Sequence, residues 1–276
     1  MGKVTYDILR GALGSDVVRL QTFLNDREGA GLVIDGVFGS GTSNAIKVFE
    51  TRNHLPVTGQ CAGATLEKLR ELGFKAVEFE VSPANSGPGF PPTPNQLPQP
   101  TAAITASLFG TFQFEHAPTP DNKEAIRILG GWQADNIVTV LIPQLVGVPI
   151  PISSTKAILS KGKVQVHKKA KDKVVALFQA WDDAGLADRI LTWDGSFNPR
   201  LKRKKTVAIP ANLSNHSFGS TFDINAGLNP LGTAPAAMGR RGCVRELVAI
   251  ANKNGFYWGG HFLSSPDGMH FEVSKL

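Results

Sequence analysis

Apolar positions in the first 80 residues recur at intervals of three and four, which is the spacing of an amphipathic helix. Three stretches carry such stripes, at residues 17–24, 42–49 and 65–72, and the third stops at Gly73. Each stretch begins at or after a short polar side chain that can cap a helix. The expected caps are Ser15 and Asp16, Thr42, and Thr65. The pattern predicts a small all-α unit of three helices.

From about residue 106 the pattern mixes strand and helix periods. Residues 137–142 are β-branched and typical of a strand, whereas residues 171–185 and 245–253 carry apolar stripes at helical spacing. Polar and apolar side chains alternate in residues 221–225 and 269–273, which predicts two strands that each bury one face. We therefore expect an α+β unit with a central antiparallel sheet, and a multidomain protein as a whole.

A Pro-rich stretch separates the two patterns. Residues 82–100 contain seven prolines and almost no charge, and proline removes amide donors and fixes φ. Such a stretch is predicted to form neither a helix nor an inner strand, and it is typical of a semi-extended linker. An ordered loop that crosses one domain is the alternative. We expect one domain at residues 1–80, a linker at 81–105 and a second domain at 106–276.

Composition narrows the class of protein. The 276 residues carry 29 Lys and Arg against 23 Asp and Glu, a net charge of +6, which favours an anionic partner such as nucleic acid, a membrane surface or an acidic wall polymer. The sequence contains no apolar run of the ~20 residues that a membrane span needs, and no nucleic-acid recognition motif. Two cysteines, Cys61 and Cys243, exclude a disulfide scaffold. We expect no nucleic-acid partner and no integral membrane segment.

Three motifs in the helical region occur in the order of a known family. They are LGSDVVRLQ at residues 13–21, DGVFG at 35–39 and LPVTG at 55–59. Together they resemble the peptidoglycan-binding domain of bacterial and phage wall hydrolases. The resemblance implies a three-helix bundle that binds wall glycan or stem peptide and has no catalysis of its own. Glu50 stands where the family usually has Gln.

Two of the six histidines, His216 and His270, lie near strands that can bring them together. The period of two places Asp223 on the polar face of one strand, and it places His270 and Glu272 on the polar face of the other. Gly219, between His216 and the first strand, can turn the chain and bring the imidazole back. Two histidines and one carboxylate form a set that leaves one zinc position open for water, and the sequence has no helical HExxH motif.

The same part of the sequence carries a second resemblance. The pattern S-x-H-x-x-G-x-x-x-D at residues 214–223, the run GFYWGG at 255–260 and the pattern D-x-x-H-F-E at 267–272 are similar to the zinc D-alanyl-D-alanine metallopeptidases. That family includes D-alanyl-D-alanine carboxypeptidases and the L-alanyl-D-glutamate endopeptidases of phage endolysins.

This second resemblance implies roles for five residues. Zn²⁺ would be held by His216, Asp223 and His270. Asp267 would be the general base that takes a proton from water and hands it to the leaving amine. The family carries an arginine upstream of the first histidine that holds the substrate carbonyl or carboxylate, and Arg200 supplies it here.

Further polar residues flank this set. His261 and Ser214 are candidate substrate contacts, with a rim position that takes no part in the chemistry as the alternative for His261. The basic run at residues 201–205 is either a contact for an anionic wall polymer or a solvated loop. Cys61 and Cys243 fall in different expected domains and support no prediction of a role.

These features predict a zinc-dependent peptidoglycan peptidase whose N-terminal domain tethers it to the wall. We expect an endolysin-like lytic endopeptidase that cleaves an L-Ala–D-Glu or a D-Ala-containing bond. The alternatives are a D-alanyl-D-alanine carboxypeptidase, a secreted antibacterial effector and a non-catalytic wall-binding protein. The first residues lack a secretory signal, so we expect the protein to be made in the cytoplasm and to reach the wall through a phage pore or a secretion apparatus. We also expect a monomer.

Overall fold

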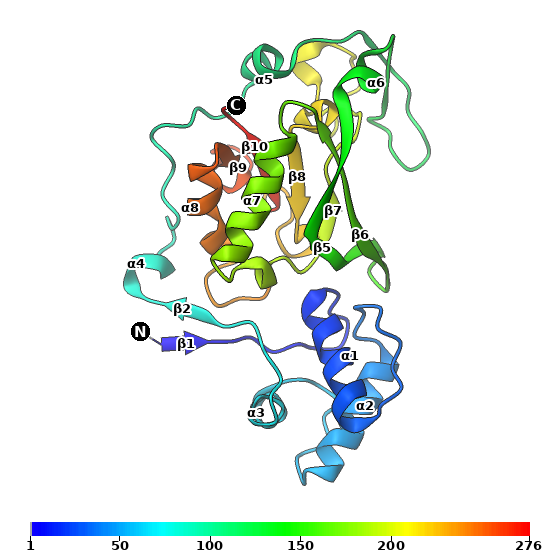
Figure 1. The fold of residues 1–276 in the computed structure, drawn as a ribbon, viewed down its shortest axis with the longest axis vertical. Coiled ribbons are helices and arrows are strands. Elements are labelled where there is room, and N and C mark those ends of the chain that lie inside the picture. Colours follow the sequence, from blue (N-terminus) through cyan, green and yellow to red (C-terminus); the bar gives the residue numbers. More distant parts are fainter. Residues whose placement is uncertain (1) are drawn as a thin grey trace.

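The computed structural model describes residues 2–276, which form a helical unit and a mixed unit that are stacked end to end (Figure 1). The helical unit comes from the N-terminal part of the chain, and the mixed unit comes from the C-terminal part. Within residues 2–276, no helix has both the length and the apolar character of a membrane span.

Three helices dominate the helical unit. They are α1 (Ser15–Glu28), α2 (Ser40–Arg52) and α3 (Gly63–Glu71). Their apolar stripes bury a common core that includes Leu20, Phe49 and Leu69. A two-stranded antiparallel ribbon, which the sequence pattern did not predict, joins β1 (Gly2–Val4) to β2 (Phe79–Val81). The two ends of the unit are therefore held beside each other.

The expected helix caps are wrong, because the side chains in question have other partners. Helix α1 begins at Ser15, and helices α2 and α3 each begin two residues before the expected cap. The described starts of all three helices show no side-chain cap hydrogen bond. Thr42 Oγ1 accepts a hydrogen bond from Gln21 Nε2 at 3.2 Å, and Thr65 Oγ1 donates one to Glu50 Oε1 at 2.8 Å. These threonines tie neighbouring helices together and do not cap their own.

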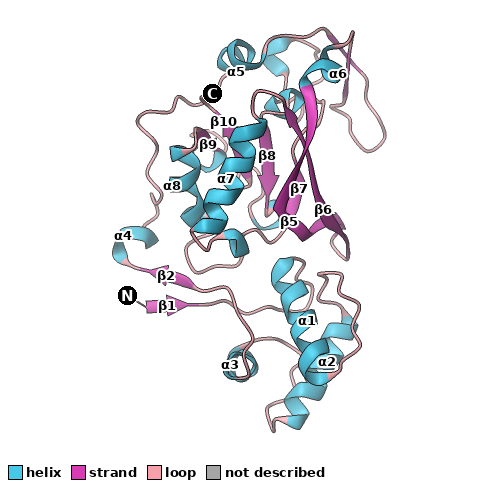
Figure 2. Ribbon diagram, viewed as in Figure 1, coloured by secondary structure: helices cyan, strands magenta, loops and turns pink. Residues whose placement is uncertain are grey.

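The mixed unit is built round a four-stranded antiparallel sheet of order β7-β8-β10-β9. Its strands are β7 (Trp193–Gly195), β8 (Thr221–Ile224), β9 (Phe256–Trp258) and β10 (His270–Val273). Helices α7 (Lys171–Asp183) and α8 (Arg245–Lys253) pack beside it (Figure 2). Phe222 of β8 and Phe271 of β10 stack with ring centroids 5.6 Å apart, and both rings pack on Trp181 of α7. The apolar face of the strands is thus the core face.

A long hairpin flanks this sheet. It consists of β5 (Ile137–Ser153) and β6 (Lys156–His167), which pair antiparallel with register shifts near Val146 and Pro149. The strand expected at residues 137–142 is therefore much longer than predicted. A two-stranded ribbon has free edges and bulges, at which the main-chain N–H is not needed for strand pairing. Proline, which lacks this N–H, is therefore tolerated at such positions.

Shorter elements connect these parts. They are α4 (Pro83–Ser86), α5 (Ala102–Phe109), β3 (Phe114–His116), β4 (Ile126–Ile128), α6 (Trp132–Asn136) and the 3-10 helices η1 (Ala187–Arg189), η2 (Pro210–Asn212), η3 (Asn215–Phe218), η4 (Ala226–Leu228) and η5 (Gly259–His261). The single turn α4 lies in the Pro-rich stretch and contradicts the expectation that this stretch forms no helix. Pro83 occupies the first turn, where its missing N–H has no helical partner to lose.

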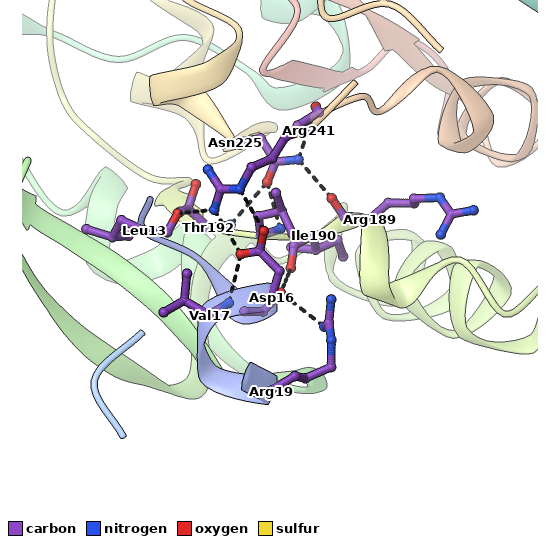
Figure 3. A network of polar contacts seen from close by, with 12 residues as sticks. Leu13, Asp16, Val17, Arg19, Arg189, Ile190, Thr192, Asn225 and Arg241 are labelled. Atoms are coloured by element: carbon purple, nitrogen blue, oxygen red, sulfur yellow. Dashed lines mark hydrogen bonds and ion pairs between the residues drawn. The ribbon is translucent and has the colours of Figure 1, made fainter. Parts of the chain in front are cut away.

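A buried polar contact joins the two units at the start of α1 (Figure 3). Asp16 is buried, and its carboxylate accepts hydrogen bonds from Arg241 Nε at 2.6 Å and from Arg241 Nη2 at 2.8 Å. Ser15 Oγ donates to Ile190 O at 2.8 Å, and Ser15 N donates to Leu191 O at 2.8 Å. The side chains that were expected to cap α1 instead fix the helical unit to the mixed unit.

Candidate metal centre and active-site cavity

Three side chains from separate elements converge on the polar side of the sheet. His216 comes from η3, Asp223 from β8 and His270 from β10, and one ligand atom from each lies within 4.8 Å of the others. Asp223 and His270 stand directly opposite each other on the antiparallel strands. Two imidazoles and one carboxylate at such separations are a donor set that suits Zn²⁺.

A left-handed glycine brings His216 to these strands. Gly219 ends η3 with φ 65°, and a Cβ at this position would lie 2.8 Å from His167 N. Only glycine fits such a position without displacing the neighbouring chain. The chain reverses there and enters β8, so that His216 Nε2 comes within 3.2 Å of Asp223 Oδ2.

His216 turns its Nε2 toward the centre. Its Nδ1 lies 2.7 Å from Ser196 O and donates to it, because a carbonyl oxygen only accepts. In the neutral ring Nε2 therefore carries the lone pair. This atom is buried and has no hydrogen-bond partner among residues 2–276. A buried polar atom without a partner is costly, and a metal ion would satisfy it.

His270 presents Nδ1 to the same centre. This nitrogen lies 2.9 Å from Asp223 Oδ1, while Nε2 on the other side of the ring lies 3.5 Å from Glu272 Oε2. Glu272 is buried and accepts a hydrogen bond from Asn215 Nδ2 at 2.6 Å. A carboxylate behind a ligating histidine fixes the orientation and the tautomer of its ring. Glu272 was not among the predicted site residues, although strand alternation places it on the face of His270.

The electrostatics of the centre favour positive charge beside Asp223. Burial alone raises the pKa of this carboxyl, but the adjacent imidazoles of His216 and His270 outweigh burial and hold the pKa far below its usual range. Burial alone lowers the pKa of His270, but its contacts with Asp223 and Glu272 raise that pKa well above the ordinary value. A dication would supply the same positive charge, so the residues fit Zn²⁺.

The centre opens into a cavity of about 420 Å³. Its lining includes the predicted site residues Arg200, Ser214, His216, Asp267 and His270. A larger cavity of about 500 Å³, beside Ser15 and Val146 at the junction of the units, is lined by different residues. The candidate chemistry is therefore concentrated in the smaller cavity.

Asp267 stands beside the three candidate ligands on the cavity wall. Its Oδ1 is buried and has no hydrogen-bond partner in the described part of the chain. Burial raises the pKa of this carboxyl, and the charge of Asp223 adds to the effect, while His270, His216 and Arg200 oppose it. A carboxyl whose pKa is raised above its usual value is suited both to accept a proton and to return it.

A close backbone approach at Gly259 positions Asp267. Asp267 N donates to Gly259 O at 2.9 Å, and a Cβ on Gly259 would lie 2.6 Å from Asp267 O and 3.0 Å from His270 Cβ. The run at residues 255–260 therefore contributes a glycine that lets two site residues pack against the main chain.

Arg200 is held by a serine from the segment that carries His216. Arg200 N donates to Ser217 Oγ at 2.9 Å, and Ser217 Oγ donates to Arg200 O at 2.8 Å. Ser214 N also donates to Arg200 O, at 3.1 Å. Burial lowers the pKa of Arg200, and the charge of Arg203 adds to this, but a guanidinium remains charged at physiological pH.

The remaining candidates have different positions. His261 is not among the cavity-lining residues, and its Nε2 lies 2.9 Å from Pro91 O of the Pro-rich stretch. Lys202 and Arg203 from the basic run line the cavity, and Arg203 also pairs with Glu124 at 3.2 Å. Substrate contact by His261 or by Ser214 stays a prediction.

Two family models match separate parts of the chain. Residues 14–69 match a peptidoglycan-binding domain, and residues 208–273 match the family described as D-alanyl-D-alanine carboxypeptidase. The second match spans His216, Asp223, Asp267 and His270, while Arg200 precedes it. Both resemblances that the motifs suggested are therefore confirmed.

Individual relatives match only part of the chain. Two curated proteins, both named spore cortex-lytic enzyme and both from Bacillus cereus, are 41% identical to this chain over 80 residues. The match covers 29% of this chain, and the chain spans 29% of the length of each of these relatives. A crystal structure of the SleB N-terminal domain is 37% identical and covers 25% of this chain and 93% of that chain, with a TM-score of 0.24.

Proposed function

We propose that this protein is a zinc-dependent peptidase that hydrolyses a bond in the stem peptides of bacterial peptidoglycan. The observation that carries the proposal is the convergence of His216, Asp223 and His270 beside Asp267 and Arg200. The two family matches support it, because one concerns wall binding and the other a peptidase that acts on D-alanine bonds.

Zn²⁺ would be held by His216 through Nε2, by the carboxylate of Asp223 and by His270 through Nδ1. When bound there, the ion would polarise the scissile carbonyl and make water a better nucleophile near neutral pH. Ser196 O and Glu272 hold the outer nitrogens of the two rings, so the ligating nitrogens are oriented in advance.

Two further residues act directly on the substrate in this proposal. Asp267 Oδ1, which has no partner among the described residues, accepts a proton from the attacking water and returns it to the leaving amine. The guanidinium of Arg200 stabilises the negative charge that develops on the carbonyl oxygen, or it holds a substrate carboxylate. Both side chains line the same cavity as the candidate metal ligands.

The helical unit, proposed as the three-helix bundle of a peptidoglycan-binding domain, would keep the peptidase at the wall. Tethering raises the effective concentration of substrate without adding chemistry. The buried pair of Asp16 and Arg241 fixes this unit to the mixed unit, so binding and cleavage would take place at a set separation on the wall.

We favour an endopeptidase that cleaves an L-Ala–D-Glu or a D-Ala-containing bond, because a wall-binding domain joined to a peptidase suits lysis. A D-alanyl-D-alanine carboxypeptidase is the second candidate, and the description of the matched family favours it. Delivery to the wall by a phage pore or as a secreted antibacterial effector would suit either activity.

Mass spectrometry of muropeptides after digestion of purified peptidoglycan tests this proposal. Internal cleavage is expected from the unsubstituted protein, whereas the loss of one terminal alanine alone would favour the carboxypeptidase. Asp267→Asn is expected to lower kcat by about 10²–10⁴-fold while zinc stays bound. Undiminished turnover by Asp267→Asn would contradict the assigned base, and the absence of any product from the unsubstituted protein would favour a non-catalytic wall-binding protein.

A further inference from the structure

The Pro-rich stretch at residues 82–100 is fixed to the mixed unit at several points. Arg245 Nη1 donates to Gly87 O at 3.2 Å, His261 Nε2 lies 2.9 Å from Pro91 O, and Ser274 Oγ donates to Pro98 O at 2.5 Å. Pro91 and Pro100 are buried. Figure 1 shows the stretch running past α8 toward α5 along the outside of the mixed unit. Its course is therefore set by the unit that contains the candidate metal centre.

The chemistry of proline explains this mode of attachment. A proline-rich stretch has few N–H donors, but its carbonyls remain free to accept hydrogen bonds in an extended conformation. Each of the three contacts uses a main-chain carbonyl of the stretch and a side chain of the mixed unit. Because φ is already restricted at the prolines, less conformational entropy is lost when the stretch is ordered.

The C-terminal end of the stretch forms a wall of the candidate active-site cavity. Gln99, Pro100, Thr101 and Ala102 line the same cavity of about 420 Å³ as His216, Asp267 and His270. Thr101 Oγ1 accepts a hydrogen bond from Ile104 N at 3.3 Å and caps α5, and Phe109 at the other end of α5 is buried in the core of the mixed unit. The wall is thus held by a capped helix on one side and by the Pro98 contact on the other.

One side chain of this wall is free to meet a ligand. Gln99 is exposed, and its amide has no hydrogen-bond partner among residues 2–276, whereas Pro100 beside it is buried. The same cavity is lined by the cations Arg200, Lys202 and Arg203. The backbone amides of a bound peptide would hydrogen-bond with the Gln99 amide, and its free carboxylates would pair with these cations.

We propose that Gln99 and the adjoining main chain of residues 99–102 form a substrate-binding subsite, which the stem peptide occupies together with the basic residues of the cavity. This inference rests on the proposed function. The match to the peptidoglycan-binding domain ends at residue 69 and the match to the peptidase family begins at residue 208, so residues 99–102 lie outside both matches. The stretch between the two domains therefore takes part in recognition of the substrate as well as joining them.

Cysteine labelling gives a direct test, because both native thiols are protected. Cys61 and Cys243 are buried, and burial raises the pKa of both thiols, that of Cys243 to about 11. Gln99→Cys places an accessible thiol on the proposed wall, and Gln96→Cys places one at an exposed position of the same stretch that does not line the cavity. Each substitution is made in full-length Asp267→Asn protein loaded with zinc, so that the peptide is bound and not consumed.

The probe is the muropeptide that the unsubstituted protein cleaves, at about ten times its KM, and the readout is the rate of maleimide labelling. The peptide is expected to slow labelling of Gln99→Cys about fivefold or more and to leave the labelling rate of Gln96→Cys unchanged, since bound substrate shields only residues that line the cavity. Equal labelling rates of Gln99→Cys with and without peptide would overturn the subsite. If the unsubstituted protein cleaves no muropeptide, the proposed function fails and the subsite fails with it.

A kinetic comparison provides an independent measurement. In protein with Asp267 intact, Gln99→Trp is expected to raise KM for the muropeptide at least about fivefold with a smaller change in kcat, and Gln96→Trp to leave both within about twofold. Equal KM values for the two variants would contradict a role of this wall in binding.

Discussion

Two buried polar clusters, one in each unit, differ in how completely their hydrogen bonds are made. In the helical unit, Glu50 accepts hydrogen bonds from Thr58 N, Thr58 Oγ1, Gly59 N and Thr65 Oγ1, so both carboxylate oxygens have two donors. In the mixed unit, His216 Nε2 and Asp267 Oδ1 are buried without hydrogen-bond partners in the described chain. A satisfied cluster stabilises a fold, whereas an unsatisfied one is costly unless a ligand completes it.

The comparison predicts that Glu50→Ala costs stability and leaves catalysis intact. Four donors lose a charged acceptor in the core, and a loss of about 3 kcal/mol in the free energy of unfolding is expected. Urea unfolding measures it, with Glu67→Ala on the exposed face of α3 as the control, for which a change within about 0.5 kcal/mol is expected. A loss below about 1 kcal/mol for Glu50→Ala would show that this cluster is not a major source of stability.

In the mixed unit the corresponding change is expected to affect catalysis. A methyl group at Gly259 would press on Asp267 O and on His270 Cβ, and a displacement of about 1 Å at a catalytic group can cost about 10²-fold in kcat. We expect that loss for Gly259→Ala on a muropeptide substrate. Gly227→Ala is the matched control, because a Cβ there meets nothing within 4 Å. Indistinguishable kcat values for the two variants would contradict the proposed positioning of Asp267.

A third buried imidazole, that of His167, belongs to the core and not to the candidate site, and it is expected to be neutral. His167 is buried against Phe109 and Trp132, and burial lowers its pKa from 6.5 to about 4, with Lys169 and Lys168 contributing. The imidazole is protonated at a higher pH in the unfolded chain than in the folded chain. The free energy of unfolding is therefore highest above about pH 6.5 and declines as the pH falls toward about 4.

From pH 7.5 to 5 this residue is expected to remove about 2 kcal/mol from the free energy of unfolding. Urea unfolding of the unsubstituted protein and of His167→Phe at both pH values measures this contribution. Between pH 7.5 and 5, the free energy of unfolding of the variant should fall by about 2 kcal/mol less than that of the unsubstituted protein. An identical pH dependence in the two proteins would contradict a neutral buried His167.

The smallest expected effect concerns the carboxylate behind His270. Glu272→Gln keeps the shape of the side chain but removes its charge, and it is expected to weaken zinc binding about tenfold, as is usual for groups that orient a ligating histidine. Competition with a chromogenic chelator gives the Kd, and Glu67→Gln serves as the surface control. Unchanged affinity would indicate that Asn215 and the strand position His270 without help from this charge.

Periodicity predicted the helices α1, α2, α3, α7 and α8 and the two site strands, because their apolar faces are set by local sequence. It failed at the start of α1, where Asp16 pairs with Arg241, a residue 225 positions away in the chain. It also failed beyond residue 142, where the β-branched pattern ends but β5 continues to Ser153 as one strand of a ribbon with free edges. Such outcomes depend on the tertiary partner and not on the local pattern.

The candidate ligands were predictable for a related reason. Asp223 and His270 lie on the polar faces of two strands, so alternation and pairing bring them together once the sheet forms. Glu272 satisfies the same criterion, but no role was predicted for it from the sequence. Gln99 could not have been found in this way, because it reaches the cavity only through the contacts that fix the Pro-rich stretch.

Zinc content of the purified full-length protein, measured beside that of His216→Ala, tests the central claim most directly. We expect about one zinc ion per chain in the unsubstituted protein and its loss in the variant, because removal of one of three protein ligands abolishes tight binding. The same low zinc content in both proteins after exposure to zinc, or the same full content in both, would contradict a metal centre at His216, Asp223 and His270.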